Sequence, residues 1–502
     1  MHQYSHSSSA ASSSPTANLA PAALPRQKVV VLQGDGIGPE VVAATVRVLN
    51  AADAPIDWEV SEAGASLFAR GVETGVPQDA LDAIESCGVA LKGPLETPIG
   101  FGNKSANVTL RKLFELYANV RPVRTLPGIK TPFSDRAIDF VVVRENVEDL
   151  YAGIEYMQTP NVAQCLKLMS RKGCRKIMRF AMELARAEGR KTLHTATKAN
   201  IMKMTEGLMK QAMEDLLPTY PDIVGDHLLI DNCAHQMVIA PEQFEVIVTS
   251  NMNGDIISDL GAGLVGGLGV APSANIGAHA AMFEAVHGSA PQIAGKGVAN
   301  PTALLLSAVM MLRHQGLFDH ANRIESAVFV TLAGCQDLTG DLAPKGQGVS
   351  TNAYVDRIIS NLGNALPGVA PRTYSNITLA AEGDRDLHPA VRELVGLDVY
   401  VDYVGDVHAL GQRLTAHCAD SDWQLKLISS RGTVVYPETN PNTDLVDHWR
   451  CRFVARHPAV ALDDEAVQKL LSHLHDQVSW MHLEKLYRFD GKDAFSKAQG
   501  ES

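Results

Sequence analysis

The segment that follows the N-terminal 27 residues has a strand, loop and helix pattern that strongly restricts the fold. Residues 29–32 (VVVL) are a β-branched run, glycines and Pro39 follow, and apolar residues then recur at helical spacing. Similar units recur downstream: strands at 88–91 and 139–143, a helix at 175–188 and a strand at 191–195. This alternation predicts an α/β fold with a largely parallel or mixed sheet.

A second region begins after a linker near residue 370, which contains Pro367, Pro371 and a polar stretch. Its predicted elements are strand 398–404, helix 407–418, strand 423–429, strand 448–455, helix 464–475 and strand 478–487. The order β-α-β-β-α-β predicts a small α+β domain of ferredoxin-like type.

Composition narrows the class of protein. The net charge of −12 argues against a protein that binds nucleic acid or acidic membranes. Seven scattered cysteines without metal-ligand spacing predict reduced thiols in a cytosol-like compartment. Residues 1–27 are rich in Ser, Ala and Pro and contain one Arg, which favours a disordered extension over a transit peptide. We therefore expect a cytoplasmic protein, or a mitochondrial matrix protein if the extension is a transit peptide.

The loop at residues 34–38 (GDGIG) is glycine-rich but does not match the dinucleotide fingerprint of a Rossmann fold. That fingerprint requires a third glycine three residues after Gly36, where the helix packs closely on the strand. Pro39 occupies this position. The sequence therefore predicts a fold of another type.

Three arginines suit a substrate with several carboxylates. Arg111, Arg121 and Arg144 carry planar donor groups that can each hold a carboxylate in two-point contact. Any one of them alone could be an ordinary surface arginine. Tyr151 follows Arg144 and is a candidate acid, although a lone tyrosine is more often a packing residue.

A lysine and three aspartates complete the predicted chemistry. Lys198 follows a predicted strand and is a candidate for proton transfer. Asp255 and Asp259 are one helical turn apart, and their repulsion would be relieved by a cation between them. Asp231 is a plausible third oxygen donor, and an all-oxygen set favours Mg²⁺ or Mn²⁺. The alternative is an exposed acidic helix start.

The small residues of the segment 284–296 (EAVHGSAPQIAGK) would let backbone N–H groups approach a bulky ligand and hold phosphate oxygens. It could equally be a structural loop.

Taken together, the motifs GDGIGPE, SANVTLR, YANVRPVR, RENVEDLYAGIE, TKANIMK, NMNGDIISD and HGSAPQIAGKGVANP resemble those of the β-decarboxylating dehydrogenases. This family comprises isocitrate, homoisocitrate, isopropylmalate and tartrate dehydrogenases. The resemblance runs from about residue 29 to 362, and LVDHWRCRF, WMHLEKL and FSKAQGE resemble the extra C-terminal domain of some bacterial isocitrate dehydrogenases.

The resemblance implies a two-domain core of isopropylmalate/isocitrate dehydrogenase type with a cleft between the domains. Residues 28–116 and 266–370 would form the large dinucleotide-binding domain, 117–265 the small domain with the dimer interface, and 376–502 an accessory domain. It further implies a homodimer or higher homo-oligomer in which one subunit gives each cleft the three arginines, Tyr151, Asp255 and Asp259. The other subunit would give Lys198 and Asp231. The dinucleotide would contact Thr97, His287, Gly288, Ser289, Ala290, Gln292, Ile293 and Asn300.

Two choices within the family depend on single residues. Ser105 and Asn107 would present polar groups to a carboxylate, which favours isocitrate over isopropylmalate, while homoisocitrate differs from isocitrate by only one methylene. The residues matching the NADP-binding positions of enteric relatives offer no cation for a 2′-phosphate. Gln292 can bond a ribose hydroxyl but cannot repel a phosphate. We predict NAD as the acceptor, with NADP as the alternative.

Overall fold

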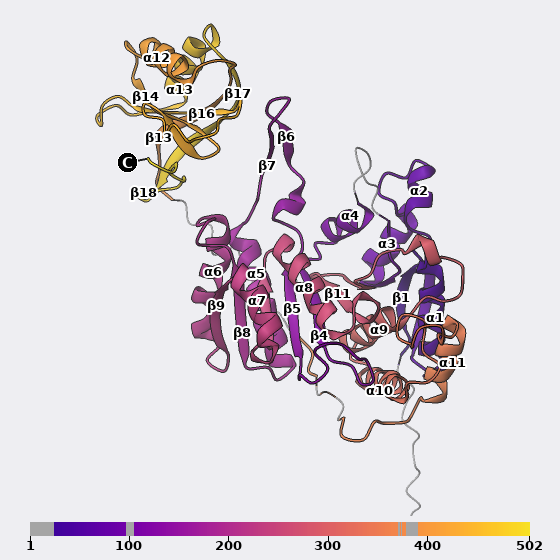
Figure 1. Ribbon diagram of the computed structural model, residues 1–502. Helices are drawn as coiled ribbons and strands as arrows, with labels where there is room; N and C mark the ends of the chain where they lie inside the picture. The colour runs from indigo at the N-terminus through magenta and orange to yellow at the C-terminus, as the bar shows by residue number, and fades with distance from the viewer. Residues whose placement is uncertain (1–24, 97–104, 370–371, 373, 378–389, 502) are drawn as a thin grey trace, which may run out of the picture.

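The computed structural model describes residues 25–96, 105–369, 372, 374–377 and 390–501, and it contains two main sheets (Figure 1). The larger has ten strands in the order β2 (Ile56–Ser61), β1 (Gln27–Leu32), β3 (Val89–Lys92), β12 (Ala281–Ala285), β11 (Pro272–Ile276), β4 (Ala118–Arg124), β5 (Asp139–Glu145), β10 (Val246–Thr249), β8 (Thr192–Thr197) and β9 (Val224–Leu229).

The ten-stranded sheet consists of two parallel halves that meet at its centre. The pairings of β12 with β11, β11 with β4 and β4 with β5 are antiparallel, and the remaining pairings are parallel. The two halves therefore run in opposite directions. This mixed sheet confirms the α/β class and the expectation of a fold other than the Rossmann type.

Helices cover both faces of this sheet. One face carries α1 (Gly38–Ala51), α5 (Arg171–Ala187), α6 (Thr205–Leu216), α9 (Thr302–His314), α10 (Phe318–Gly334) and α11 (Thr351–Ser360), which share one apolar core. The other face carries α3 (Gln78–Cys87) and α4 (Ala106–Leu113) on one half, with α7 (Ile230–Ile239) and α8 (Asn251–Val265) on the other. The short helix α2 spans Ala65–Ala69.

Local sequence explains where several of these helices begin. Pro39 lies in the first turn of α1, where its missing N–H costs nothing. The Ser170 side chain accepts a hydrogen bond from the Gly173 N–H and caps α5. Helix α5 then buries Ile177, Met178 and Ala181 at helical spacing against the sheet.

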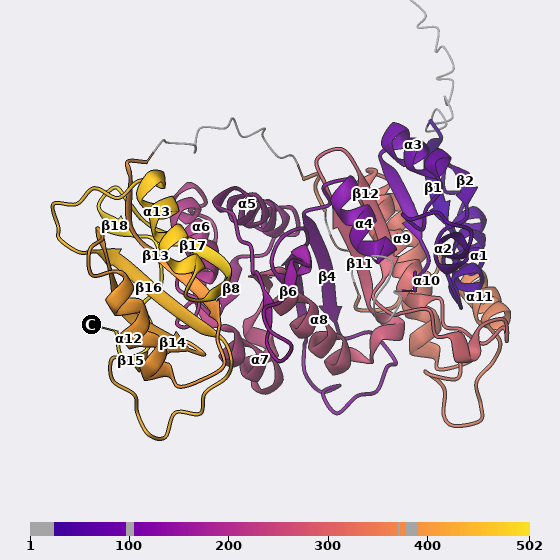
Figure 2. The same cartoon turned by 90° about the horizontal axis from the view of Figure 1, so that it is seen from above.

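The C-terminal region has its own sheet and core. Its strand order is β15 (Thr433–Tyr436), β14 (Trp423–Ser430), β16 (Trp449–Ala455), β13 (Arg392–Asp402), β17 (Ser479–Phe489) and β18 (Lys492–Asp493), with helices α12 (Val407–His417) and α13 (Asp464–His475). The four central strands are antiparallel and follow the ferredoxin-like order, which confirms the prediction. Figure 2 shows this region at one end of the molecule, with α1 and α11 at the other.

A short hairpin, β6 (Glu155–Met157) and β7 (Ala163–Cys165), extends from the region of the large sheet to the C-terminal region and was not predicted. Asn161 Nδ2 donates to Asp447 Oδ2 at 3.0 Å, and His482 Nδ1 lies 2.8 Å from Gln158 Oε1. The hairpin tip therefore contacts the C-terminal sheet. No helix in the described ranges is long and apolar enough to span a membrane.

Candidate active site

The predicted acidic pair lies on helix α8. Asp255 and Asp259 are one turn apart, and Arg121 of β4 faces both of them. Arg121 Nη1 lies 3.2 Å from Asp255 Oδ1 and 3.4 Å from Asp259 Oδ1. Within one chain the Arg121 guanidinium thus supplies the positive charge that relieves the repulsion between the two carboxylates.

Arg144, at the end of β5, is fully buried beside the same helix. Its Nε and Nη2 donate to Asn251 Oδ1 at 3.0 and 2.7 Å, and its Nη1 forms an ion pair with Asp255. Burial, together with the nearby charges of Arg121 and Arg111, lowers the pKa of Arg144 to about 10. The side chain still carries its charge at neutral pH, so it can hold a carboxylate.

Tyr151 lies on a 3-10 turn, Leu150–Ala152, and points at the same aspartate. Its hydroxyl donates to Asp255 Oδ2 at 2.6 Å, and the Arg144 guanidinium lies 5.0 Å from the centre of its ring. Burial raises the pKa of Tyr151, and the hydrogen bond to Asp255 raises it further. Tyr151 is therefore protonated at neutral pH and can act as an acid.

We call Arg121, Arg144, Tyr151, Asp255 and Asp259 the arginine–aspartate cluster. Burial tends to raise the pKa of Asp255, but the charges of Arg144 and Arg121 outweigh this and hold it below its ordinary value. For Asp259, burial raises the pKa despite Arg121. The two carboxylates thus differ in environment although they share one helix face.

Arg111, the third predicted arginine, comes from α4 and is held by a buried carboxylate that the sequence analysis missed. Arg111 Nη2 donates to Glu284 Oε1 at 3.1 Å. Lys92 Nζ lies 2.5 Å from Glu284 Oε2, and Asn275 Nδ2 donates to Glu284 Oε1 at 2.8 Å. Lys92 and Glu284 interrupt otherwise apolar strands, which is the signal that could have identified them.

Two of the arginines keep unused donors. Arg111 Nε and Arg121 Nε are buried and have no hydrogen-bond partner among the described residues. A buried donor without a partner is costly, so such groups are usually satisfied by a ligand. These two donors suit an anion with several oxygens. Asn107 Oδ1, on the first turn of α4 after Ser105, is a buried acceptor that is unpaired within the described ranges and suits a ligand hydroxyl.

Lys198 and Asp231 lie elsewhere in the chain and pair with each other. Lys198 follows β8 and Asp231 begins α7, and Lys198 Nζ lies 2.7 Å from Asp231 Oδ1. The hydrogen bond from Lys198 lowers the pKa of Asp231. Lys198 is partly and Asp231 largely exposed, and among the described residues neither forms a hydrogen bond or ion pair with the arginine–aspartate cluster of the same chain.

The structure brings together two of the three aspartates that were predicted to bind a metal ion. In the described part of the chain, no group of three or more His, Cys, Asp or Glu side chains could hold a metal ion. Asp255 and Asp259 offer two carboxylates on one helix, an all-oxygen set that fits Mg²⁺ or Mn²⁺. One chain thus provides part of a coordination sphere, and Asp231 would have to come from a second copy.

A buried ion network, which was not predicted from the sequence, holds the start of α8 and the backbone of Lys198 in place. Lys167 Nζ forms ion pairs with Asp149 and with Glu206, the latter at 2.7 Å. Asp149 Oδ2 accepts the Met252 N–H at 2.8 Å, which fixes the first turn of α8. Glu206 Oε2 accepts the Lys198 N–H at 3.1 Å. The network thus positions the helix that carries the aspartates and the backbone of Lys198.

The predicted dinucleotide loop packs on the glycine-rich loop after β1. The Ile37 N–H donates to Ser289 O at 2.8 Å. Gly36 has φ +59°, and a Cβ there would lie 2.0 Å from Ser289 O, so only glycine fits. His287 Nε2 is buried without a partner among the described residues. His287 Nδ1 donates to the Gly288 carbonyl oxygen at 3.0 Å, so the free Nε2 is an acceptor. This acceptor and the open backbone beside Gly288 fit a polar ligand such as a dinucleotide.

The rest of the predicted dinucleotide loop is held by Glu40 of α1 and by a hydrogen bond between Asn300 and Asp341. Glu40 accepts the N–H groups of Gly297 and Ala299 at 3.2 and 2.8 Å. Asn300 Nδ2 donates to Asp341 Oδ2 at 2.8 Å, so Asn300 supports the loop that contains Asp341. Ala290, Gln292 and Ile293 lie at the 3-10 turn Pro291–Ile293, while Thr97 lies outside the described residues.

Glu145, next to Arg144, provides a pH test of this packing. Burial raises its pKa to about 7, although the Val147 and Glu148 N–H groups oppose the shift. Between about pH 4.5 and 7 the folded chain therefore holds a proton that the unfolded chain has lost. The free energy of unfolding should fall by roughly 1–3 kcal/mol as pH rises through this window.

Glu145→Gln should remove this fall, because glutamine does not titrate. Urea unfolding at pH values from about 5 to 8 measures the effect, with the exposed Glu214→Gln as the control that keeps the pH dependence. An unchanged pH profile in Glu145→Gln would exclude Glu145 as its source.

Comparison with known proteins agrees with the geometry. Residues 28–358 match the family model described as isocitrate/isopropylmalate dehydrogenase, and residues 392–501 match the bacterial isocitrate dehydrogenase C-terminal domain. The chain is 57% identical to the isocitrate dehydrogenase [NADP] of Thermus thermophilus, covering 95% of this chain and 96% of that one. It is 39% identical to the Rickettsia bellii isocitrate dehydrogenase [NADP], covering 94% and 99%. A crystal structure of a Thermus thermophilus protein superposes with a TM-score of 0.91 at 56% identity, covering 95% and 97%.

These relatives show that the prediction of an NAD-dependent enzyme is wrong, because both are named for NADP. The prediction of NAD considered only the positions that match the NADP site of enteric relatives. Lys345 directly follows Pro344, one of these positions, and Lys296 lies in the dinucleotide loop. Both lysine side chains are exposed. The Asn300–Asp341 hydrogen bond ties the loops that carry these lysines together. A cation therefore need not stand at the matched positions.

The family model covers most of the chain, the relatives cover nearly all of it, and the fold matches a solved structure over the same length. The chain belongs to the isocitrate/isopropylmalate dehydrogenase family.

Proposed function

We propose that this protein catalyses the oxidative decarboxylation of isocitrate to 2-oxoglutarate and CO₂, with NADP as acceptor and Mg²⁺ or Mn²⁺ as metal. The observation that carries the proposal is the convergence of Arg121 and Arg144 on Asp255. Arg111 of α4, held by Glu284, is near enough for its charge to lower the pKa of Arg144. Such a site combines cations for a tricarboxylate with carboxylates for a metal. The names of the full-length relatives support the substrate and the acceptor.

The start of α4 supports isocitrate as the substrate. Ser105 precedes the helix and Asn107 lies in its first turn. The Ser105 hydroxyl and the Asn107 side-chain N–H can donate to a substrate carboxylate, whereas an apolar substituent offers them no acceptor, which disfavours isopropylmalate. Homoisocitrate is one methylene longer and remains the competitor to exclude by experiment, since a methylene changes binding by only about 1–3 kcal/mol.

The side chains divide the chemical work. Arg111, Arg121 and Arg144 would hold the substrate carboxylates. Lys198 and its partner Asp231 would together help to remove the proton from the substrate hydroxyl, and Tyr151 would return a proton to carbon after CO₂ has left. The raised pKa of Tyr151 suits this role because it keeps the proton on the hydroxyl until it is needed.

Asp255 and Asp259 of one subunit, with Asp231 of the other, would hold the metal. A bound Mg²⁺ or Mn²⁺ supplies Lewis-acid stabilisation of the charge that develops on the substrate oxygen, and the dinucleotide accepts the hydride. His287, Gly288, Ser289, Ala290, Gln292, Ile293 and Asn300 would line or support the dinucleotide site, together with Thr97.

The 2′-phosphate of NADP requires a cation, and Lys345 is our candidate for it. Lys345 is exposed and lies on the loop that Asn300 holds through Asp341. Gln292 is uncharged and does not repel a phosphate. Both features favour NADP over NAD.

We further propose that the enzyme is a homodimer. Ile256 and Met252 lie one turn apart on α8, with exposed fractions of 62% and 37%, and Ile239 on α7 is half exposed. An exposed apolar patch of this kind is typical of an interface. A second copy at this face would also bring Lys198 and Asp231, which lie apart from the cluster in one chain, to the site.

Steady-state kinetics test the function directly. Isocitrate, homoisocitrate and isopropylmalate are each assayed with NADP and with NAD. We expect the highest kcat/KM for isocitrate with NADP, and we expect EDTA to abolish turnover until Mg²⁺ or Mn²⁺ is restored. A higher kcat/KM with another acid would reject the substrate, a higher value with NAD would reject the acceptor, and full activity in EDTA would reject the metal.

Tyr151→Phe tests the proton-return step. The variant keeps the ring beside Arg144 but loses the hydroxyl, so decarboxylation of the β-keto acid intermediate should fall by about 10²–10⁴-fold and its reduction much less. Separate assays of the two partial reactions measure this, with Tyr156→Phe on the exposed hairpin as control. Equal losses in both partial reactions would count against the role given to Tyr151.

A further inference from the structure

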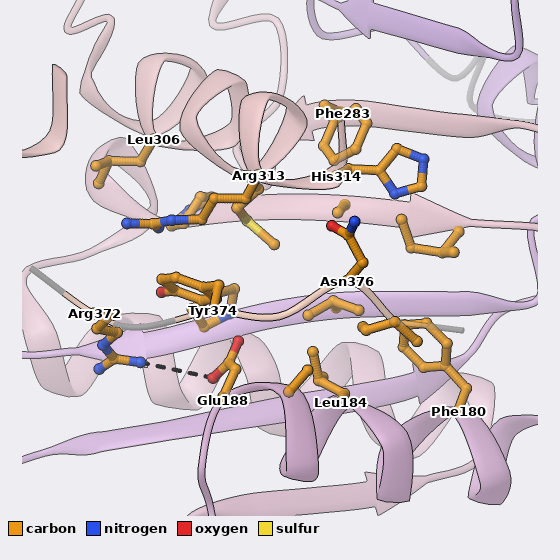
Figure 3. Close-up of a pocket in the computed structure, with 18 of the residues that line it drawn as sticks. Phe180, Leu184, Glu188, Phe283, Leu306, Arg313, His314, Arg372, Tyr374 and Asn376 are labelled. Carbon is orange, nitrogen blue, oxygen red and sulfur yellow. Dashed lines mark ion pairs between the residues drawn. The ribbon is translucent and has the colours of Figure 1, made fainter. Parts of the chain in front are cut away.

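A large cavity lies on the face of the ten-stranded sheet opposite to the arginine–aspartate cluster (Figure 3). Its volume is about 690 Å³. Strands β4 and β11 form its floor, α5 forms one wall, and α9 and α10 form the other. We call it the rear cavity. Small-molecule sites in proteins have volumes of about 300–1,000 Å³, so the rear cavity can hold a small organic ligand.

Strand β4 separates the rear cavity from the candidate active site. Val120 and Pro122 line the cavity floor, while Arg121 between them donates to Ser258 of α8 at 2.7 Å on the other face. Successive side chains of a strand point to opposite faces of the sheet. A ligand in the rear cavity would therefore press on the same strand that carries Arg121, without entering the active site.

The walls of the rear cavity offer a broad apolar surface. Phe180 and Leu184 of α5 stand on one side, with Leu306 and Met310 of α9 on the other, and Phe283 of β12 extends the floor (Figure 3). These side chains come from the two halves of the large sheet. The aromatic or aliphatic part of a ligand would be buried between the side chains of α5 and those of α9.

The rim of the rear cavity is predominantly cationic. Among the described lining residues, six are lysines or arginines: Arg124, Lys172, Lys176, Arg179, Arg313 and Arg372. Three are carboxylates: Asp139, Glu188 and Glu325. These carboxylates are engaged in ion pairs, since Arg372 pairs with Asp139 and Glu188, and Arg313 with Glu325 at 2.8 Å. Lys176 pairs with Glu115, which lies outside the lining, at 3.2 Å. The lining itself still carries more cations than carboxylates, which favours an anionic ligand.

Two polar groups of α9 have unused hydrogen-bonding capacity here. The Arg313 side chain is nine-tenths buried, and its Nε has no hydrogen-bond partner among the described residues. His314 contacts the Phe283 ring, with 5.6 Å between ring centres, and its ring nitrogens have no partner in the described ranges. Both groups line the rear cavity, so either could donate to an acidic head group.

Residues 374–377 line the rear cavity and contact both of its walls. The Tyr374 ring lies under the Arg313 guanidinium, 4.0 Å from ring centre to Cζ. The Ser375 N–H donates to Ala187 O, at the end of α5, at 3.2 Å. Figure 3 shows this segment passing between the walls. The rear cavity is thus a built space with a floor, two walls and a covering segment.

We propose that the rear cavity is a second ligand site, which binds a small organic anion with an apolar aromatic or aliphatic body and one acidic head group. The apolar walls would hold the body, and the cationic rim with Arg313 and His314 would hold the head. This site goes beyond the proposed reaction, because it lies on the other face of the sheet.

The probe is 8-anilinonaphthalene-1-sulfonate, whose aromatic rings and single sulfonate have this chemistry. The full-length protein is titrated with the dye, which is excited directly. We expect saturable binding of about one dye per chain, unaffected by saturating NADP and isocitrate. Displacement by NADP would place the dye in the dinucleotide site and overturn the proposal, as would the absence of saturable binding.

Two variants locate the dye. Met310→Trp fills the cavity and should remove the saturable binding, whereas Leu445→Trp on the C-terminal region should not. Lys176→Glu reverses one rim charge and should weaken binding about fivefold, whereas the exposed Lys191→Glu outside the cavity should not. Lys176 is at the surface, so this second variant remains informative if Met310→Trp fails to fold. Unchanged binding in Lys176→Glu and in folded Met310→Trp would overturn the proposal.

Discussion

Replacing Lys198 by methionine is expected to lower kcat by about 10²–10⁴-fold while the thermal unfolding midpoint stays unchanged. Under the proposed mechanism the lysine moves the hydroxyl proton, and methionine keeps the length of the side chain without a titratable group. The fold should tolerate the change because Lys198 is partly exposed and its ion pair with Asp231 lies at the surface, where such pairs contribute little.

Lys203→Met is the matched control, because Lys203 is an exposed lysine of the same loop. It should leave kcat and the unfolding midpoint as in the wild type. Steady-state kinetics at saturating isocitrate, NADP and Mg²⁺ measure both variants. A Lys198→Met enzyme with wild-type kcat would remove Lys198 from the proposed proton transfer.

Glu284→Gln is expected to lower the free energy of unfolding by about 3–5 kcal/mol. Lys92 is almost fully buried and would lose its carboxylate partner, which leaves an uncompensated charge in the core. The charges of Lys92 and Arg111 outweigh burial and hold the pKa of Glu284 well below its ordinary value, so the native side chain is ionised. Arg111 would also lose its anchor, and KM for isocitrate should rise.

Urea unfolding measures the change in stability, and Glu242→Gln is the control. Glu242 pairs with Arg136 at 2.6 Å at the surface, so its loss should cost less than about 1 kcal/mol. Equal losses in the two variants would mean that the buried network around Glu284 contributes no more than a surface ion pair.

The sequence was sufficient to predict the fold class because the pattern of apolar residues depends on local geometry. The four long strands and two helices of the ferredoxin-like region were predicted from their own periodicity, whereas the short strands β15 and β18 were not. The hairpin around Gln158 was missed because its strands have three residues each and contact the C-terminal sheet through polar side chains. A strand of three residues is too short to show the alternation of apolar and polar residues that identifies a strand in a sequence.

The sequence predicted only part of the candidate site, because some of its residues lie far apart along the chain and meet only after folding. Arg121, Arg144 and Asp255 stand in recognisable motifs, and the structure brings them together. Glu284 and Lys92 meet only after folding, and nothing local indicates their pairing. The sequence also suggested a metal as the cation between the two aspartates, whereas in the single chain the Arg121 guanidinium contacts both.

The choice of dinucleotide shows the limit of matching single positions. The absence of a cation at the matched positions argued for NAD, but a phosphate can be held by any cation that the loop geometry brings near. The loop that contains Asp341 and Lys345 is held by Asn300, which belongs to a different segment of the chain. Loop placement is a tertiary property, and the sequence pattern did not contain it.

The central claim is that each active site is completed by a second copy of the chain. Two variants that should each be inactive test it: Lys198→Met, and Asp259→Asn on a half-exposed side chain of α8. The two chains are co-expressed with different tags, and dimers that carry both tags are isolated. Such a dimer would contain one intact and one doubly defective site.

Measuring kcat of the doubly tagged dimer is therefore the most direct test. We expect about half of the wild-type activity per dimer, because one site combines wild-type Lys198 with wild-type Asp259. A doubly tagged dimer as inactive as either parent would contradict the shared site.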